Sequence, residues 1–158
     1  MKLAIGSDKS GFAVKVAVKA YLAGTEHEID DLGTVDLSDV HPYYQVAADV
    51  APKLQDGSYD RAILICGTGA GMSVVANKFK GVYAVACESL YAAKMSRAIN
   101  NANVLCMGGW IVGPEMAVEL VKAFLSTEWC QDLEPWRAEN MHKFAAKVSA
   151  IEDEIYGA

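Results

Sequence analysis

The sequence alternates short apolar runs with segments of helical periodicity, and this alternation strongly limits the fold. Five runs predict strands, at residues 2–6, 27–32, 61–66, 82–86 and 104–107. The run at 61–66 (RAILIC) has no polar/apolar alternation, as in a strand that is buried on both faces. Buried strands separated by helices predict a parallel sheet covered on both sides. We therefore expect the α/β class, as a doubly wound three-layer α/β/α sandwich with a five-stranded parallel sheet.

Helical periodicity fills the intervals between these strands. The predicted helices cover about residues 11–22, 46–54, 73–80 and 89–97, one opened by Pro114, and an extra C-terminal helix at about 135–156. The C-terminal helix carries one apolar face, made of Met141, Phe144, Ala145, Val148, Ile151 and Ile155. Because it follows a domain that already has its five strands, we expect it to cap the domain or to contact a second subunit.

Composition narrows the class further. The 158 residues fit one domain, 1–158, and 53% hydrophobic against 22% charged residues is typical of a chain with a packed core. A net charge of −6 without a basic run argues against a nucleic-acid partner. Charge-free stretches are too short to span a membrane, and the apolar start is too short for a signal peptide. We expect a cytoplasmic protein without a membrane partner.

Four cysteines are present, Cys66, Cys87, Cys106 and Cys130, and no two form a CxxC pair. This spacing disfavours a zinc ribbon and a dithiol redox motif, so reduced thiols are expected. We interpret Cys87 and Cys106 as small buried hydrophobes.

Residues 66–73 (CGTGAGMS) carry the sharpest chemical signal. Glycines at alternate positions allow a tight turn and a close approach of the backbone to a ligand. The N–H groups of this loop and of the following helix predict a nest for negative charge. This setting should favour the thiolate form of Cys66, and the Thr68 hydroxyl could orient the thiol or a substrate oxygen. From the motif alone, an ordinary turn after a buried strand remains the alternative.

Ligands of doubly wound sheets bind beyond the carboxyl ends of the strands. Two polar clusters, at residues 7–9 and 66–71, fall at such ends, and a third at Asn100 and Asn101 precedes the last strand. A dinucleotide fingerprint needs G-x-G-x-x-G, and a phosphate loop needs Gly-Lys-Ser/Thr; neither is present. The three histidines, His27, His41 and His142, are more typical of surface or structural positions than of a partner for a nucleophilic cysteine.

Motifs along almost the whole chain carry a family resemblance. They are GSDKSGF (6–12), DLGT (31–34), ICGTGAGMS (65–73), ANK (76–78), NNANV (100–104) and IVGP (111–114). Together they resemble the type B ribose-5-phosphate isomerase and galactose-6-phosphate isomerase family. The resemblance implies a Rossmann-like sandwich, a homodimer or tetramer with active sites at the subunit interface, and aldose–ketose isomerisation of a sugar phosphate. It also implies that neither a metal nor an organic cofactor takes part.

The resemblance assigns a role to each candidate residue. Cys66 would be the base that removes the proton next to the carbonyl, giving a cis-enediolate, and Thr68 would assist ring opening or orient Cys66. Asp8 would hold substrate hydroxyls, and Asn100 would steady the enediolate; helix capping is the alternative for both. The implied anion hole consists of Gly67, Gly69, Ala70, Gly71 and Ser73.

Departures from the family pattern bear on the substrate. Ile99 stands where the family has the histidine that opens the sugar ring, and Lys9 stands where the family has a second histidine. Trp110, Asn140 and Phe144 stand where arginines usually hold the phosphate, which leaves open whether the substrate is phosphorylated. We expect Lys9 to supply part of the lost anion binding. The sequence of the last helix resembles that of the second galactose-6-phosphate isomerase subunit more than that of a ribose-phosphate isomerase.

These departures predict an isomerase for a sugar other than ribose 5-phosphate. An aldotetrose 4-phosphate cannot close a five-membered ring, because the necessary hydroxyl is esterified, so it needs no ring-opening histidine. We therefore expect four-carbon sugar phosphates to be better substrates. Two alternatives stay open: ribose-5-phosphate isomerase itself, and one subunit of a two-component galactose-6-phosphate-type enzyme with a paralogous partner. A sugar-binding regulator is disfavoured by the intact loop around Cys66.

Overall fold

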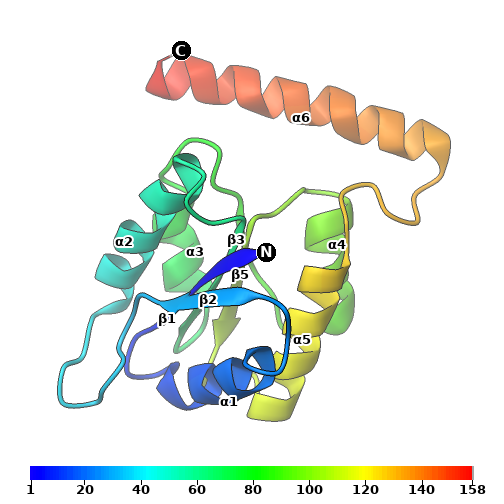
Figure 1. Cartoon of the computed structure of the whole chain (residues 1–158). Helices are drawn as coiled ribbons and strands as arrows, with labels where there is room; N and C mark the ends of the chain where they lie inside the picture. The colour runs from blue at the N-terminus through cyan, green and yellow to red at the C-terminus, as the bar shows by residue number, and fades with distance from the viewer. Residues whose placement is uncertain (158) are drawn as a thin grey trace.

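The computed structural model describes residues 1–157 as a parallel sheet with helices on both faces (Figure 1). The strands are β1 (Lys2–Ser7), β2 (Glu28–Asp31), β3 (Arg61–Cys66), β4 (Ala84–Ala86) and β5 (Val104–Gly108). The helices are α1 (Phe12–Leu22), α2 (Tyr43–Gln55), α3 (Ala70–Ala76), α4 (Leu90–Ala98), α5 (Pro114–Ser126) and α6 (Pro135–Tyr156). The strand order is β2-β1-β3-β5-β4, and every neighbouring pair is parallel. The predicted fold class is confirmed.

Successive residues of the central strands point to opposite faces of the sheet, and both faces are buried. On one face Leu3, Ile63 and Leu105 pack under α1 and α5, and on the other Ala4, Leu64 and Cys106 pack under α2 and α3. Burial on both faces explains why the strand sequences are continuously apolar. The expected burial of Cys87 and Cys106 is also confirmed.

The helix predicted at 73–80 is wrong at both ends, since α3 spans Ala70–Ala76. Gly69 precedes it with a left-handed φ of 78°, which lets the chain turn directly from the loop into the helix. At the other end the helix stops before Asn77, which is its C-cap residue. The side-chain amide of Asn77 donates to the carbonyl of Ala84 and accepts from the Ala84 N–H, both at 2.8 Å. The strand predicted from residue 82 accordingly starts at Ala84.

A buried ion pair ties α1 to β2 and to the loop that leads into α2. The side chain of Lys15 is 1% exposed and donates to both oxygens of Asp31 at 2.8 Å and to the carbonyl of Thr34. Lys19 adds a contact of 2.7 Å to Asp31. Burial lowers the pKa of Lys15. Burial would raise the pKa of Asp31, but the hydrogen bonds from both lysines hold it below its usual range.

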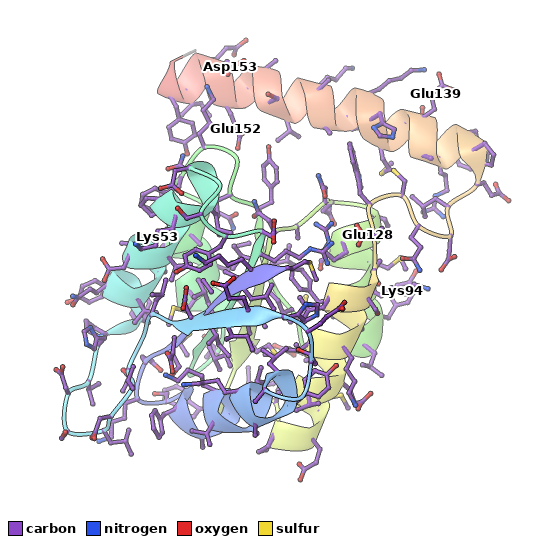
Figure 2. All side chains as sticks on the ribbon, in the orientation of Figure 1. Lys53, Lys94, Glu128, Glu139, Glu152 and Asp153 are labelled. Carbon is purple, nitrogen blue, oxygen red and sulfur yellow. The ribbon has the colours of Figure 1, made fainter. Side chains whose placement is uncertain are left out.

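Helix α6 lies apart from the helical layers, over the segments that precede β4 and β5 (Figure 1). None of its described residues is buried. Near its C-terminal end, Glu152 accepts from the Tyr83 hydroxyl at 2.9 Å and Asp153 pairs with Lys80 at 2.7 Å, whereas Glu139 lies toward the other end (Figure 2). In the part of the chain that the structure describes, no helix combines the length and apolarity needed to cross a membrane.

We predict that Lys15→Met destabilises the fold, because the largely buried Asp31 carboxylate keeps Lys19 as its cationic partner and the N–H of Gly33 as a donor, but loses its buried cation. Loss of one partner of a buried ion pair typically lowers the free energy of unfolding by about 3–5 kcal/mol. Urea unfolding at neutral pH measures the loss. Asp31 has a lowered pKa, so its ionic stabilisation is present above about pH 4 and fades as pH falls further, and the difference from wild type should shrink there.

Lys19→Met is the matched control, because Lys19 is 40% exposed and Asp31 keeps Lys15 in that variant. An exposed pair contributes about 0–1 kcal/mol, so equal losses in the two variants would contradict the assignment.

Candidate active site

The order of the strands reverses between β1 and β3, where the chain turns toward β2 on one side and toward β5 and β4 on the other. The loops that follow β1 and β3 meet above this point, since the N–H of Asp8 donates to the carbonyl of Ile65 at 3.2 Å. A topological switch point of this kind is the usual ligand site of an open α/β sheet. A cavity of about 300 Å³ lies there, the catalytic pocket, lined by Asp8, Ser10, Tyr43, Cys66, Gly67, Thr68, Gly71 and Trp110.

Cys66 ends β3 at the base of the catalytic pocket and is 4% exposed. Its Sγ accepts a hydrogen bond from the N–H of Gly69 at 3.2 Å. The loop can aim that N–H at the sulfur because Gly69 adopts a φ of 78° and lies against the backbone of Met107, where a Cβ would be 2.9 Å from the carbonyl carbon. A donor in this position suits a sulfur that becomes negatively charged.

Cys66 is the one cysteine, among residues 1–157, that lines the catalytic pocket. Cys106 is fully buried in β5, and burial raises the pKa of its thiol well above the usual value, so it stays protonated. Burial also raises the pKa of Cys87. Cys130 lies near His142, with 4.0 Å between Sγ and Nε2, at the start of α6.

Asp8 serves the local fold and the pocket together. Its Oδ1 accepts the N–H of Gly11 at 3.0 Å, just before α1, and within residues 1–157 no hydrogen bond involves its Oδ2. Helix α1 has no side-chain cap from its own N-cap residue, so Asp8 orders this turn. The capping alternative is therefore correct for one oxygen, while the carboxylate still lines the pocket.

Five of the predicted site residues line the catalytic pocket together: Asp8, Cys66, Gly67, Thr68 and Gly71. The other four expected nearby, Lys9, Gly69, Ala70 and Ser73, adjoin the lining without being part of it. Lys9 is exposed between Asp8 and Ser10. Ser10 and Tyr43 also line the pocket and were not predicted from the sequence, whereas Trp110 was predicted only as a replaced arginine. No spacing signal pointed to Tyr43, which the loop after β2 brings to the pocket.

Asn100 lies at the opposite edge of the sheet, so within one chain it does not join the two clusters at the carboxyl ends of the strands. Helix α4 runs back along the sheet and ends at Ala98, beside the amino ends of the strands. β3, whose six residues span about 16 Å at the usual rise per residue, separates this edge from Cys66.

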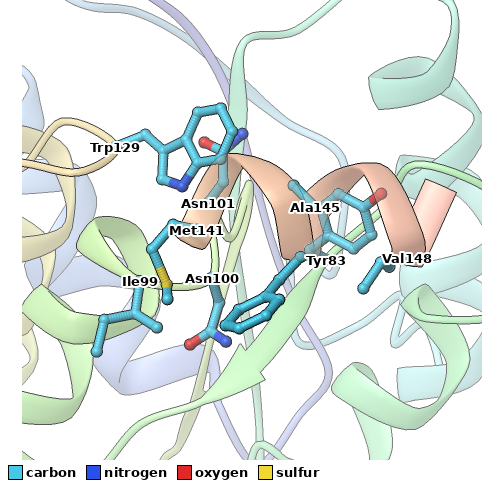
Figure 3. Close-up of a pocket in the computed structure, with 9 residues that line it drawn as sticks. Tyr83, Ile99, Asn100, Asn101, Trp129, Met141, Ala145 and Val148 are labelled. Carbon is cyan, nitrogen blue, oxygen red and sulfur yellow. The ribbon is translucent and has the colours of Figure 1, made fainter. Parts of the chain in front are cut away.

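Asn100 instead lines a second cavity of about 310 Å³, the α6 groove (Figure 3). Its lining is Tyr83, Ile99, Asn100, Asn101, Trp129, Met141, Phe144, Ala145 and Val148. The apolar face predicted for the last helix therefore supplies one wall of the groove. Burial and the bond to Glu152 raise the pKa of Tyr83 to about 12, so its hydroxyl stays protonated.

Charged groups are scarce in both cavities. Among the described residues, Asp8 is the one carboxylate in the lining of the catalytic pocket, and neither lining contains lysine or arginine. Across residues 1–157, no three histidine, cysteine, aspartate or glutamate side chains are arranged to hold a metal ion. The catalytic pocket thus offers a thiol, hydroxyls, backbone N–H groups and aromatic walls.

Known proteins show what this chain is similar to. The family described as Ribose/Galactose Isomerase matches residues 3–141. A protein of Clostridium sp. (strain MSTE9) named 4-deoxy-4-sulfo-D-erythrose isomerase is 53% identical over 156 residues, which cover 99% of this chain and 98% of that protein. A protein of Mycolicibacterium smegmatis named D-erythrulose-4-phosphate isomerase 2 is 41% identical, over 82% of this chain and 86% of its own.

Solved structures agree with these sequence similarities. The structure of ribose-5-phosphate isomerase B from Clostridium thermocellum superposes with a TM-score of 0.86 at 34% identity, covering 98% of this chain and 99% of the other.

We predict that Gly69→Ala abolishes most activity, because a left-handed φ and a backbone contact leave no room for a Cβ without moving the N–H that faces Cys66. Gly57→Ala is the matched control, since Gly57 has a φ of 77° with open space around the added Cβ. Both variants carry a left-handed penalty of about 1–2 kcal/mol. Thermal unfolding and kcat/KM, measured together, should show lost activity for Gly69→Ala alone; retained activity there would contradict the role of the loop.

Proposed function

The chain belongs to the Ribose/Galactose Isomerase family and is a sugar isomerase, and we propose that its substrate is a four-carbon aldose with a sulfonate on C4. The reaction would convert 4-deoxy-4-sulfo-D-erythrose into the ketose 4-deoxy-4-sulfo-D-erythrulose. The observation that carries this proposal is a catalytic pocket with a thiol base and no lysine or arginine in its described lining. A sulfonate has a single negative charge, so it requires less compensation than a phosphate dianion.

Ring chemistry supports the same substrate. A 4-deoxy-4-sulfo aldotetrose has no hydroxyl on C4, so it cannot close a five-membered ring and its aldehyde is free or hydrated. Ile99 lines the α6 groove beside Asn100, so it would reach the substrate from a second copy of the chain, and it has no acid–base group with which to open a ring. The similarity to the sulfo-erythrose isomerase over 99% of this chain also includes α6, which forms one wall of the groove.

The chemistry we propose needs only a proton transfer between two carbons. The Cys66 thiolate removes the proton from C2, the C2–H electrons form the C1–C2 double bond, and the carbonyl electrons move to O1. The thiol proton exchanges with solvent, and the thiol then protonates C1 while the proton of the C2 hydroxyl passes to O1, leaving a ketone at C2. C1 is reduced as C2 is oxidised, so no external oxidant or reductant enters.

The remaining residues of the catalytic pocket would bind and orient the substrate. Loop N–H groups at Gly67, Ala70 and Gly71, with the Ser73 hydroxyl, are proposed to face the oxyanion that develops on O1. The free oxygen of Asp8 is suited to accept substrate hydroxyls, and Thr68 to orient O1 or O2. Lys9, exposed at the margin, would supply one positive charge for the terminal anion.

We further propose that a second copy of the chain completes each site. The α6 groove is apolar, and helix α6 exposes Phe144, Val148 and Ile151. The margin of the catalytic pocket exposes apolar side chains of its own, among them Tyr44 and Ile111. Docking this margin into the groove of a partner would cover both surfaces and bring the partner's Asn100 to the enediolate that Cys66 forms.

A second candidate substrate is a tetrose 4-phosphate, which also stays open-chain. It is favoured by the 41% identity to a D-erythrulose-4-phosphate isomerase. Ribose 5-phosphate is less favoured, because its ring must open before isomerisation and Ile99 lies where an acid–base side chain would be needed.

A substrate panel in D₂O tests the proposed function. Comparison of kcat/KM should rank 4-deoxy-4-sulfo-D-erythrose first, erythrose 4-phosphate second and ribose 5-phosphate third, with deuterium appearing at C1 of the ketose. Cys66→Ser should lower kcat by about 10²–10⁴, the usual contribution of a general base, and stop the isotope exchange. Cys130→Ser is the control, since Cys130 lies outside the pocket. Full exchange in Cys66→Ser would overturn the assignment of the base.

Mixing two impaired variants tests the shared site. Asn100→Ala should lower kcat by about 10²–10³ if Asn100 faces the oxyanion. Co-expression with Cys66→Ser should then restore about one quarter of the wild-type activity, because half of the dimers are mixed and each of these holds one intact site. The control is Cys66→Ser co-expressed with the variant that carries both Cys66→Ser and Asn100→Ala, because this pair forms no intact site. If activity is not restored although mixed dimers form, the partner's Asn100 has no place in the mechanism.

A further inference from the structure

Trp110 is a side chain of the catalytic pocket to which the proposed chemistry gives no role. It lines the pocket together with Asp8 and Cys66 and is 74% exposed. The ring lies against Gly67, where a Cβ would be 2.8 Å from Cε3 and Cζ3. Cδ2 lies almost as near, at 2.9 Å, so the face of the six-membered ring covers Gly67, and Nε1 is not among the atoms nearest to that Cβ. No hydrogen bond of Nε1 is found within residues 1–157.

The backbone of Trp110 is held in place. The N–H of Trp110 donates to the carbonyl of Gly67 at 3.0 Å, and the N–H of Gly109 donates to the carbonyl of Cys66 at 2.7 Å. Gly109 also lies so close to the carbonyl of Ser10 that a Cβ would overlap it. The turn that carries Trp110 therefore packs between the loop after β1 and the loop after β3. The turn holds the Trp110 backbone, and the indole packs on Gly67 as one wall of the catalytic pocket.

An indole offers one N–H donor and no charge. The charges near it are those of Asp8, which lines the pocket, and Lys9, which is exposed beside it. A phosphate ester at neutral pH carries a charge of about −1.5 to −2, because its second pKa is near 6. A sulfonate carries −1. Burying the second negative charge against a neutral wall and a carboxylate is unfavourable.

We propose that Trp110 is a specificity-determining residue, whose neutral indole selects a C4 sulfonate over a C4 phosphate and donates its Nε1–H to a sulfonate oxygen. This inference rests on the proposed function and deepens it, since it names the residue that decides between the two candidate tetroses. Trp110 does not take part in the proton transfer. Its effects therefore belong in KM and in the ratio of the two substrates, with kcat for the sulfonate nearly unchanged.

The test compares the sulfonate and the phosphate tetrose on the wild type, Trp110→Phe and Trp110→Arg. Trp110→Phe keeps a ring and loses the N–H, so KM for the sulfonate should rise about tenfold or more, the loss of one hydrogen bond to a charged group. Trp110→Arg should shift the kcat/KM ratio toward the phosphate by at least about tenfold, since arginine binds phosphate with charge and paired donors. Tyr91→Arg is the control, with the same 74% exposure outside both cavities.

A pH series on the wild type gives a readout that requires no substitution. As pH falls from about 8 to about 5.5, the phosphate gains a proton while the sulfonate does not, so the ratio should move toward the phosphate. Changes in the enzyme that affect both substrates equally cancel in the ratio.

The outcomes separate this inference from the function on which it rests. A wild type that converts neither tetrose overturns the proposed function and this inference with it. A wild type that prefers the sulfonate, with a ratio that neither the variants nor pH changes by more than twofold, overturns the role of Trp110 alone. Size-exclusion chromatography shows whether Trp110→Arg still forms a dimer. If it does not, Trp110→Phe and the pH series decide the role of Trp110.

Discussion

The hydrogen bonds that pair β1 with β3 hold side by side the two strands whose following loops carry Asp8 and Cys66. Because the sheet continues to β2 on one side and to β5 on the other, the connections after these strands diverge and leave a space between them. The same pairing sets the depth of Cys66, which is the last residue of a strand that is otherwise fully enclosed. Moving the chain by one residue in this register would turn the thiol toward α1 and away from the pocket.

The glycines of the 66–71 loop serve the reaction in two ways. Gly69 turns its N–H toward the sulfur, and Gly67 leaves the space that the indole of Trp110 occupies. In the proposed reaction the loop would supply donors where charge develops, and the indole a neutral wall where the substrate ends. Moving a proton between neighbouring carbons requires a base and a stabilised oxyanion, and cations matter only for the terminal anion. A pocket with few charges suits a substrate whose terminal group carries one.

The parts of the fold that local chemistry dictates could be predicted from the sequence. The central strand at 61–66 and the turn after it follow from a continuous apolar run that ends in glycines, and the burial of Cys106 follows from its place in another such run. The start of α3 could not be predicted, because the left-handed φ of Gly69 lets the helix begin three residues before the predicted one. Whether Asn100 reaches the other clusters could not be decided from the sequence, for a different reason. A crossover helix returns antiparallel to its strands, so residues just after it lie at the amino edge.

By itself the sequence determined the alternation of buried strands and helices, the parallel sheet that follows from it, and the chemistry of the loop at residues 66–73. It could do so because burial patterns and glycine turns depend on residues close together in the chain. Only the tertiary structure decided which side chains share a cavity: Tyr43 and Trp110 reach Cys66 across separate loops, while Asn100 does not. Such contacts depend on strand order and on the direction of each crossover, which arise when distant segments pack. For that reason the loop that holds Cys66 could be predicted from the sequence, whereas the other walls of its pocket required the fold.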